Sequence, residues 1–197
     1  MVAKKETISI PFETPIIKDV VIHFLFKDDE ANLSQSGGLY YLQGLRSKVL
    51  EGIFGDSEKN PYADLYRMEL QKYVKELCDS LDVQSIEAIV CPPSSKPYLQ
   101  RPYLEAIKNA NNSIIDLTGS IKRKKNISAG KGIDLNSYID GLYIEKPEKL
   151  NSIRSLLVVD DVLGRGKTVA ALVSFLRNNG LPNDGRVEVM CPLWITG

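Results

Sequence analysis

The sequence predicts an α/β fold with a mainly parallel central sheet flanked by helices. Short apolar runs, typical of strands that are buried on both faces, recur along the chain, and stretches with helical spacing lie between several of them. The 197 residues are 43% hydrophobic and 25% charged, a composition that allows a packed core without disulfides. We therefore expect a single domain over residues 1–197, with an N-terminal strand and helices in 1–84 and a core that carries ligand loops in 85–197.

The first elements lie in the N-terminal part of the chain. Residues 20–26 are mostly β-branched or aromatic and predict a strand, and the segment 36–38, which contains two glycines, marks a break after it. Apolar residues spaced by three and four predict an amphipathic helix over 61–81, opened by Asn60 and Pro61.

Strands and helices alternate in the second part of the chain. Helices are expected near 103–110 and 168–179, the second of which ends at Gly180. Apolar runs predict four strands of the parallel sheet, at 85–91, 113–117, 155–160 and 186–191. This order is typical of strand–helix–strand units with a parallel sheet.

The segment 119–150 interrupts this alternation. It contains the glycines Gly130, Gly132 and Gly141, a basic run from Lys122 to Lys125, and little sustained periodicity. We expect a mobile loop or hood here, with one short hairpin, because long loops in compact domains are usually functional or disordered. The basic run is either a solvated charged face or a ligand contact. A nucleic-acid contact is a third reading, and it predicts binding with a steep salt dependence.

Composition narrows the classes of function. Twenty-five Lys and Arg balance twenty-five Asp and Glu, so nucleic acid is not the expected general partner. The three cysteines show no metal-like spacing, which suits a reduced, cytoplasmic protein, and no apolar run reaches the length of a membrane span. His23 is the sole histidine, so we expect a structural role and no multi-histidine metal cluster.

The most informative segment is 156–168. It begins with four apolar residues, and Asp160 and Asp161, a glycine-containing loop and the start of a helix follow. A helix N-terminus at the carboxyl end of a parallel strand offers backbone N–H groups and a partial positive charge to a phosphate. Two carboxylates beside it are suited to accept hydrogen bonds from hydroxyl groups or to help hold a cation. A phosphorylated sugar satisfies both requirements.

Two other interpretations apply to parts of this segment. Residues 166–168 read Gly-Lys-Thr, as at the end of a nucleotide-binding P-loop, but the first glycine of that pattern would fall at Asp161. Aspartates also end strands and cap helices. Two in succession directly after a buried run favour a site, because burying a carboxylate without partners is costly.

The segment resembles the phosphoribosyl pyrophosphate site of the type I phosphoribosyltransferases. The resemblance implies that Asp160 and Asp161 contact the ribose 2- and 3-hydroxyls as the catalytic pair. It also implies that the following loop and the Thr168 hydroxyl hold the 5-phosphate; the loop comprises Val162, Leu163, Gly164, Arg165, Gly166, Lys167 and Thr168. Gly166 and Thr168 agree with the family pattern, whereas Gly164 and Arg165 stand where the family favours small hydroxyl residues.

A second resemblance lies upstream, in the run 86–96 and the helix after it. Its Pro-rich turn and downstream arginine are similar to the ComF-like branch of the family. The resemblance implies that the pyrophosphate contacts Ser94, Ser95, Lys96 and Arg101. A plain polar turn after Pro92 and Pro93 is the alternative.

The resemblance implies an enzyme that transfers the phosphoribosyl group from phosphoribosyl pyrophosphate to a nitrogenous acceptor and releases pyrophosphate. Mg²⁺ would be held mainly by the ligand, so no metal-ligating residues are expected in the protein. The partner is then a small molecule and not a membrane, with a homodimer or a regulatory protein partner left open. The alternative is a catalytically inactive module that senses a nucleotide or sugar phosphate.

Overall fold

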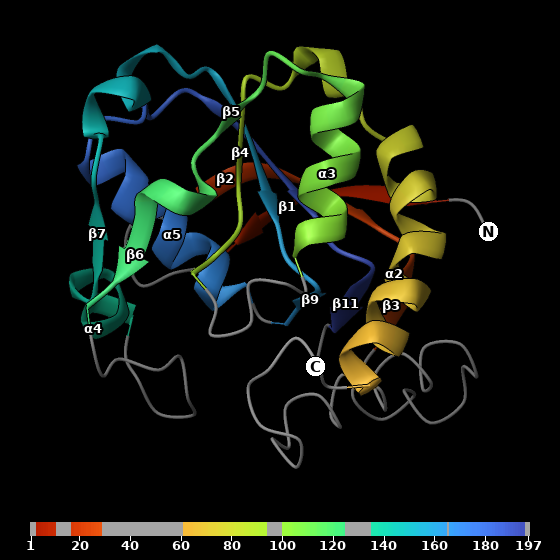
Figure 1. The fold of residues 1–197 in the computed structure, drawn as a ribbon. Coiled ribbons are helices and arrows are strands. Elements are labelled where there is room, and N and C mark those ends of the chain that lie inside the picture. The colour runs from red at the N-terminus through yellow and green to blue at the C-terminus, as the bar shows by residue number, and fades with distance from the viewer. Residues whose placement is uncertain are drawn as a thin grey trace.

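The computed structural model describes residues 3–10, 17–28, 61–93, 100–124, 135–164 and 166–195. Its centre is a six-stranded sheet in the order β1-β2-β10-β8-β4-β5 (Figure 1). The strands are β1 (Lys4–Ile10), β2 (Ile17–Phe24), β4 (Ala88–Val90), β5 (Ile115–Asp116), β8 (Ser155–Val159) and β10 (Arg186–Met190). Only the β1–β2 pair is antiparallel, so the predicted α/β class with a mainly parallel sheet is confirmed.

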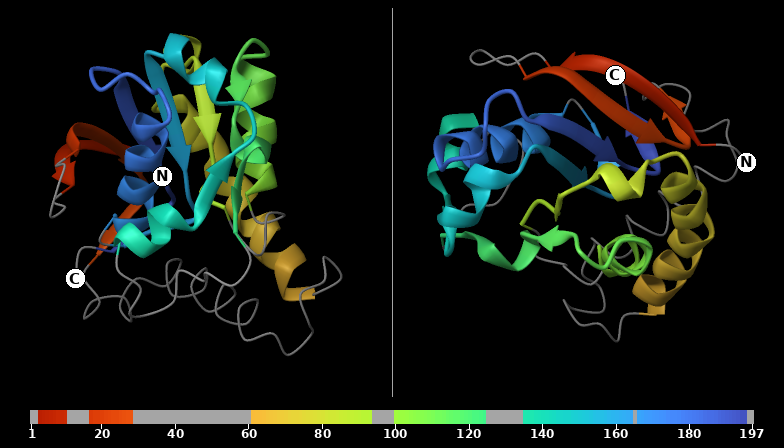
Figure 2. Two further views of the ribbon diagram at one scale, coloured as in Figure 1. Left: turned by 90° about the vertical axis from the view of Figure 1, so that its left-hand side faces the viewer. Right: turned by 90° about the horizontal axis from the view of Figure 1, so that it is seen from above.

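Helices cover both faces of this sheet, as expected for strands that are apolar on both sides. All five residues of β8 are buried. Leu156 and Val158 pack in the cluster that contains α5 (Lys167–Asn178), whereas Leu157 and Val159 pack in the cluster that contains residues of α2 (Pro61–Asp79) and α3 (Arg101–Ala110). Figure 2 shows α2 and α3 on one face and α5 on the other. The predicted helices over 61–81, 103–110 and 168–179 are therefore present.

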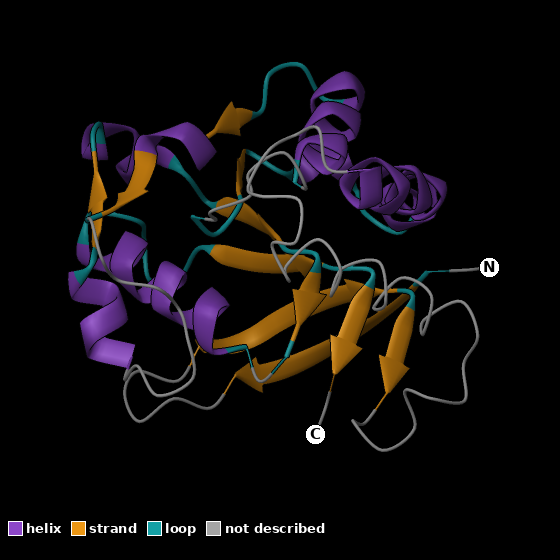
Figure 3. Ribbon diagram, turned by 60° about the horizontal axis from the view of Figure 1, so that its bottom comes forward, coloured by secondary structure: helices purple, strands orange, loops and turns teal. Residues whose placement is uncertain are grey.

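Three neighbouring strands bend at their carboxyl ends and pair again in a second sheet. This three-stranded parallel sheet has the order β3-β11-β9 (Figure 3). Its strands are β3 (Phe26–Asp28), β9 (Val162–Leu163) and β11 (Leu193–Ile195), which continue β2, β8 and β10 respectively. Backbone hydrogen bonds cross the bends, including one from the Asp160 N–H to the Met190 carbonyl at 3.1 Å. The residues between β8 and β9 are Asp160 and Asp161, so the acidic pair forms the bend.

The predicted excursion over 119–150 contains the expected hairpin. β6 (Ile121–Arg123) and β7 (Leu142–Ile144) pair antiparallel. The segment also holds α4 (Leu135–Asp140) and two 3₁₀ helices, η3 (Thr118–Ser120) and η4 (Pro147–Ser152). None of these short helices was predicted, because elements this short do not establish a 3.6-residue repeat. Residues 125–134 lie outside the described part of the chain.

Some elements differ from expectation. The edge strand β1 was not predicted, since Lys4–Ile10 is largely polar and carries its isoleucines only near its end. The expected strand at 85–91 begins later, because a 3₁₀ turn, η1 (Val83–Ser85), precedes β4. The break expected at 36–38 lies outside the described residues. Within the described residues, no helix has the length and apolarity needed to cross a membrane.

The histidine joins three elements of the fold. His23, on β2, is buried; its Nε2 lies 2.5 Å from Glu188 Oε2 on β10, and its Nδ1 lies 3.0 Å from Ser80 Oγ just after α2. The Ser80 hydroxyl donates to the Leu77 carbonyl at 2.7 Å. Because that proton is already donated to the backbone, this Ser–His–Glu chain is arranged as a structural link and not as an activated nucleophile.

The His23–Glu188 pair predicts a pH dependence of stability. Burial alone would raise the pKa of the Glu188 carboxyl, but the hydrogen bond with His23 and the charge of Arg186 hold it below the ordinary value of 4.5. Ionised Glu188 therefore stabilises the fold above that ordinary value, and this contribution is lost as pH falls through the lower pKa of the folded state. In urea denaturation between about pH 5 and pH 3, the free energy of unfolding should fall more steeply for the unchanged chain than for Glu188→Gln. Parallel curves would contradict this assignment.

Candidate functional site

The acidic pair lies at the middle of the sheet's carboxyl edge. β8 is an inner strand between β10 and β4, and all three run parallel. Asp160 and Asp161 follow it directly and are both half-buried. The Asp161 N–H donates to Asp160 Oδ1 at 2.9 Å, which orients the first carboxylate. Ligands of open parallel sheets bind beyond the carboxyl ends of the strands, so this position favours a binding role for the pair.

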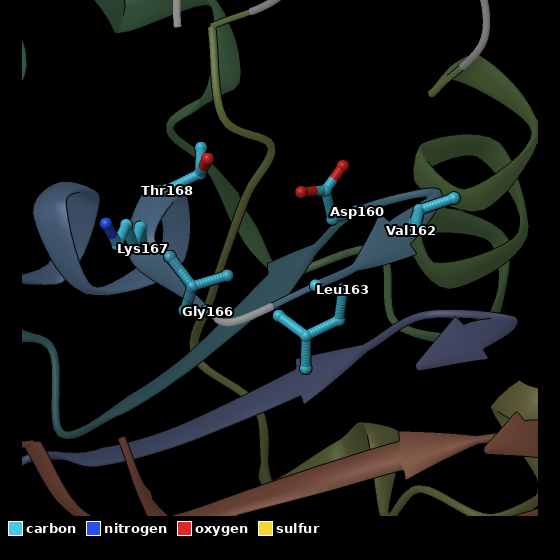
Figure 4. Close-up of a pocket in the computed structure, with 8 residues that line it drawn as sticks. Asp160, Val162, Leu163, Gly166, Lys167 and Thr168 are labelled. Atoms are coloured by element: carbon cyan, nitrogen blue, oxygen red, sulfur yellow. The ribbon is translucent and has the colours of Figure 1, made fainter. Parts of the chain in front are cut away.

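A pocket of about 180 Å³ opens beside the acidic pair. In Figure 4 the side chains of Asp160 and Thr168 stand on the same side of the connecting loop, while Leu163 points the opposite way and Lys167 points away from the carboxylate. The pocket is lined by Asp160, Val162, Leu163, Gly164, Gly166, Lys167, Thr168 and Val169. A carboxylate and a hydroxyl thus share one small pocket with the N-terminus of a helix.

The start of α5 at this pocket has features that favour an anion. Gly166 caps α5 with φ 74°, a left-handed conformation that favours glycine. The Ala170 N–H donates to the Gly166 carbonyl at 3.0 Å, so the N–H groups of residues 167–169 precede the first bond within the helix. These N–H groups, together with the positive end of the helix dipole, favour an anion.

Two glycines of this loop give a matched prediction. Gly166→Ala should lower the free energy of unfolding by about 1 to 2 kcal/mol, because a side chain is strained at positive φ. Gly164→Ala should change it by less than about 0.5 kcal/mol, since a Cβ at Gly164 meets no atom within 4 Å. Urea denaturation of the two variants measures the difference. Equal effects would contradict the left-handed cap.

The negative charge of Asp160 affects the pKa of three buried side chains. Burial raises the pKa of the Cys91 and Cys191 thiols, and the charge of Asp160 raises both further. Burial likewise raises the pKa of Tyr138, the charge of Arg123 opposes this, and that of Asp160 adds to it. Both cysteines are free and buried, and their raised pKa values keep them as unreactive thiols.

A polyphosphate bound beside these carboxylates would need a cation to offset the repulsion between the negative charges. Carboxylate oxygens are the hard ligands that Mg²⁺ prefers, so Asp160 and Asp161 fit this ion. Within the described part of the chain, no group of three or more His, Cys, Asp or Glu residues is arranged to hold a metal. Mg²⁺ in this pocket would therefore take most of its oxygen ligands from a bound phosphate compound and from water.

The other predicted site residues are placed as follows. Arg101 is exposed at the first position of α3. Val162 is half-buried and Leu163 is buried, and both pair with β11 in the second sheet. Ser94, Ser95, Lys96 and Arg165 lie outside the described residues. The first two residues of the ligand loop expected over 162–168 thus belong to a short strand, and both also line the pocket.

The three described residues of the basic run make different contacts. Lys122 pairs with Glu145 of the hairpin, and Lys124 donates to the Asp140 carbonyl, whereas Arg123 donates to the Pro93 carbonyl. The distinct placement of Arg123 was missed at the sequence level. The two-residue alternation of a strand, with Ile121 buried and Lys122 exposed, is the signal that separates it from its neighbours.

Comparison with solved structures finds similarities that include an adenine phosphoribosyltransferase. The chain is similar to the crystal structure of adenine phosphoribosyltransferase from Thermoanaerobacter pseudethanolicus, at 13% sequence identity and a TM-score of 0.44, over 68% of this chain and 84% of that one. No protein-family model and no curated protein matches the chain.

Proposed function

We propose that this chain binds phosphoribosyl pyrophosphate with Mg²⁺ and transfers the phosphoribosyl group to a nitrogenous acceptor, releasing pyrophosphate. One observation carries the proposal: the carboxylate of Asp160 and the hydroxyl of Thr168 share a pocket with the N-terminus of α5, at the carboxyl end of an inner parallel strand. A sugar needs hydroxyl acceptors and its phosphate needs N–H donors, and this pocket offers both within one ligand's reach.

The roles of the residues follow from this arrangement. Asp160 and Asp161 accept hydrogen bonds from the ribose hydroxyls and thereby fix the sugar ring. The N–H groups at the start of α5 and the Thr168 hydroxyl donate to the 5-phosphate. With both ends held, the anomeric carbon is presented to the acceptor in a fixed direction, which lowers the entropic part of the barrier.

The reaction breaks the bond between the anomeric carbon and the pyrophosphate oxygen and forms a bond from that carbon to the acceptor nitrogen. The proton of that nitrogen passes to water, and the electron pair of the broken bond leaves with the pyrophosphate. Positive charge grows on the sugar in the transition state, and the nearby carboxylates stabilise it. Mg²⁺, when bound, neutralises charge on the departing pyrophosphate. Water must be kept from the anomeric carbon, because hydrolysis competes with transfer.

One feature of the loop favours a second candidate function. Gly164 and Arg165 replace the small hydroxyl residues of the family pattern, so the phosphate would have fewer hydroxyl donors. A module that binds a sugar phosphate or nucleotide and signals to a partner without turnover is consistent with this loss. The turn at Pro92 and Pro93 supports the ComF-like branch in either case.

Pyrophosphate release tests the proposal and separates the two candidates. The purified chain is incubated with phosphoribosyl pyrophosphate, Mg²⁺ and each of a panel of nucleobases, and binding is measured on the same samples by titration calorimetry. Release that depends on one nucleobase supports the transferase. Binding without release supports the sensor, and the absence of binding at millimolar ligand contradicts both.

A further inference from the structure

The strand β6 presents its basic residues to two different sides. Ile121 is buried, Lys122 and Lys124 are exposed, and Arg123 is half-buried on the same side as Ile121. Lys122 Nζ donates to Glu145 Oε1 at 2.5 Å, and Lys124 Nζ donates to the Asp140 carbonyl at 2.8 Å. Both lysines therefore contact residues within 121–145. Arg123, in contrast, contacts a residue outside that range.

Arg123 connects the hairpin to the carboxyl end of β4. Its Nη2 donates to the carbonyl of Pro93, a residue 30 positions earlier in the chain. Pro93 follows β4 by three residues, and β4 is the parallel neighbour of β8, whose end carries the acidic pair. This contact therefore holds the end of one strand beside the site at the end of the next.

Tyr138 supports the guanidinium in this position. Nη2 of Arg123 also donates to the Tyr138 hydroxyl at 3.5 Å, and the guanidinium carbon lies 5.4 Å from the centre of the tyrosine ring. The ring is 5% exposed and packs in the same apolar cluster as α5, so it cannot swing away. Burial raises the pKa of Tyr138, the charge and hydrogen bond of Arg123 oppose this, and the charge of Asp160 adds a smaller rise.

We propose that Arg123 is a positioning residue that holds the end of β4 at the distance from Asp160 which the pyrophosphate part of the ligand requires. This inference rests on the proposed function and adds a residue to it. A guanidinium suits the task because it is planar and always charged, so it can stack on a ring while donating to a carbonyl. Lysine carries the same charge but offers no planar fork.

The test compares two ligands that differ only by the pyrophosphate group. Affinities for phosphoribosyl pyrophosphate and for ribose 5-phosphate, both with Mg²⁺, are measured by titration calorimetry for the unchanged chain, Arg123→Ala, Arg123→Lys and the neighbouring control Lys122→Ala. Arg123→Ala is expected to weaken phosphoribosyl pyrophosphate binding by about 10-fold or more. Ribose 5-phosphate binding should stay within about twofold, and Arg123→Lys should recover only part of the loss.

The outcomes separate this inference from the proposed function. An equal loss for both ligands would mean that Arg123 serves the fold alone, and unchanged affinity for phosphoribosyl pyrophosphate would mean that it serves neither; each overturns the inference and leaves the proposed function standing. Failure of the unchanged chain to bind either ligand overturns both. Tyr138→Phe keeps the ring and removes the hydroxyl, so it provides a second test if Arg123→Ala does not fold. It should produce a smaller loss of affinity, for phosphoribosyl pyrophosphate and not for ribose 5-phosphate.

Discussion

Replacing both acidic residues, by Asp160→Asn and Asp161→Asn together, is expected to weaken the binding of phosphoribosyl pyrophosphate by about 100-fold or more. In the proposed complex each carboxylate accepts hydrogen bonds from ribose hydroxyls, and a hydrogen bond to a charged group contributes about 1.5 to 3 kcal/mol. Loss of two such acceptors, and of the charge that attracts Mg²⁺, reduces affinity far more than loss of one neutral contact. Titration calorimetry at constant Mg²⁺ concentration measures the change.

A matched control removes one carboxylate away from the site. Asp184 is exposed in the turn that precedes β10, at the amino edge of the sheet, whereas the acidic pair follows β8 at the carboxyl edge. Asp184→Asn should bind the ligand with unchanged affinity. The double variant should unfold at nearly the same temperature as the unchanged chain. If it binds the ligand as tightly as the unchanged chain, the acidic pair is not the sugar site.

The largest expected effect on stability comes from Leu157→Ala. Leu157 is fully buried in the inner strand β8, where it packs in the cluster shared with α2 and α3. Truncation loses the buried methyl groups and leaves a cavity, which together cost about 2 to 5 kcal/mol. For a chain of this length, a loss in that range lowers the midpoint of thermal unfolding by about 4 to 20 °C.

An exposed leucine serves as the control. Leu65 on α2 is 42% exposed, so Leu65→Ala should change the free energy of unfolding by less than about 1 kcal/mol. Calorimetry or circular dichroism on the two variants gives the comparison. Similar losses in the two variants would contradict the placement of β8 at the centre of the core, and with it the placement of the acidic pair.

Residue patterns predicted the inner strands and the longer helices because burial dictates those patterns directly. A run such as 156–159 is apolar at every position only when both faces of the strand are covered. Edge and short elements leave weaker signals. β1 carries its isoleucines only near its end, and α4 is less than two turns long. Tertiary packing therefore determines whether these two elements form.

The site was predictable to the extent that it is local in sequence. Asp160, Gly166 and Thr168 lie within nine residues, and strand, bend and helix N-terminus follow one another along the chain. The contact of Arg123 with Pro93 spans 30 positions and depends on where the hairpin lies relative to the residues that follow β4. No local pattern encodes that distance. The sequence does contain the two-residue alternation of a strand, which places Arg123 on the opposite side from Lys122 and Lys124.

A crystal structure of the chain with phosphoribosyl pyrophosphate and Mg²⁺ would show directly whether a sugar phosphate binds at the acidic pair and the start of α5. We expect the ribose hydroxyls within hydrogen-bond distance of the Asp160 and Asp161 carboxylates, and the 5-phosphate on the N–H groups at the start of α5. A ligand bound elsewhere, or one with its phosphate away from α5 and its ribose out of reach of both carboxylates, would contradict the account.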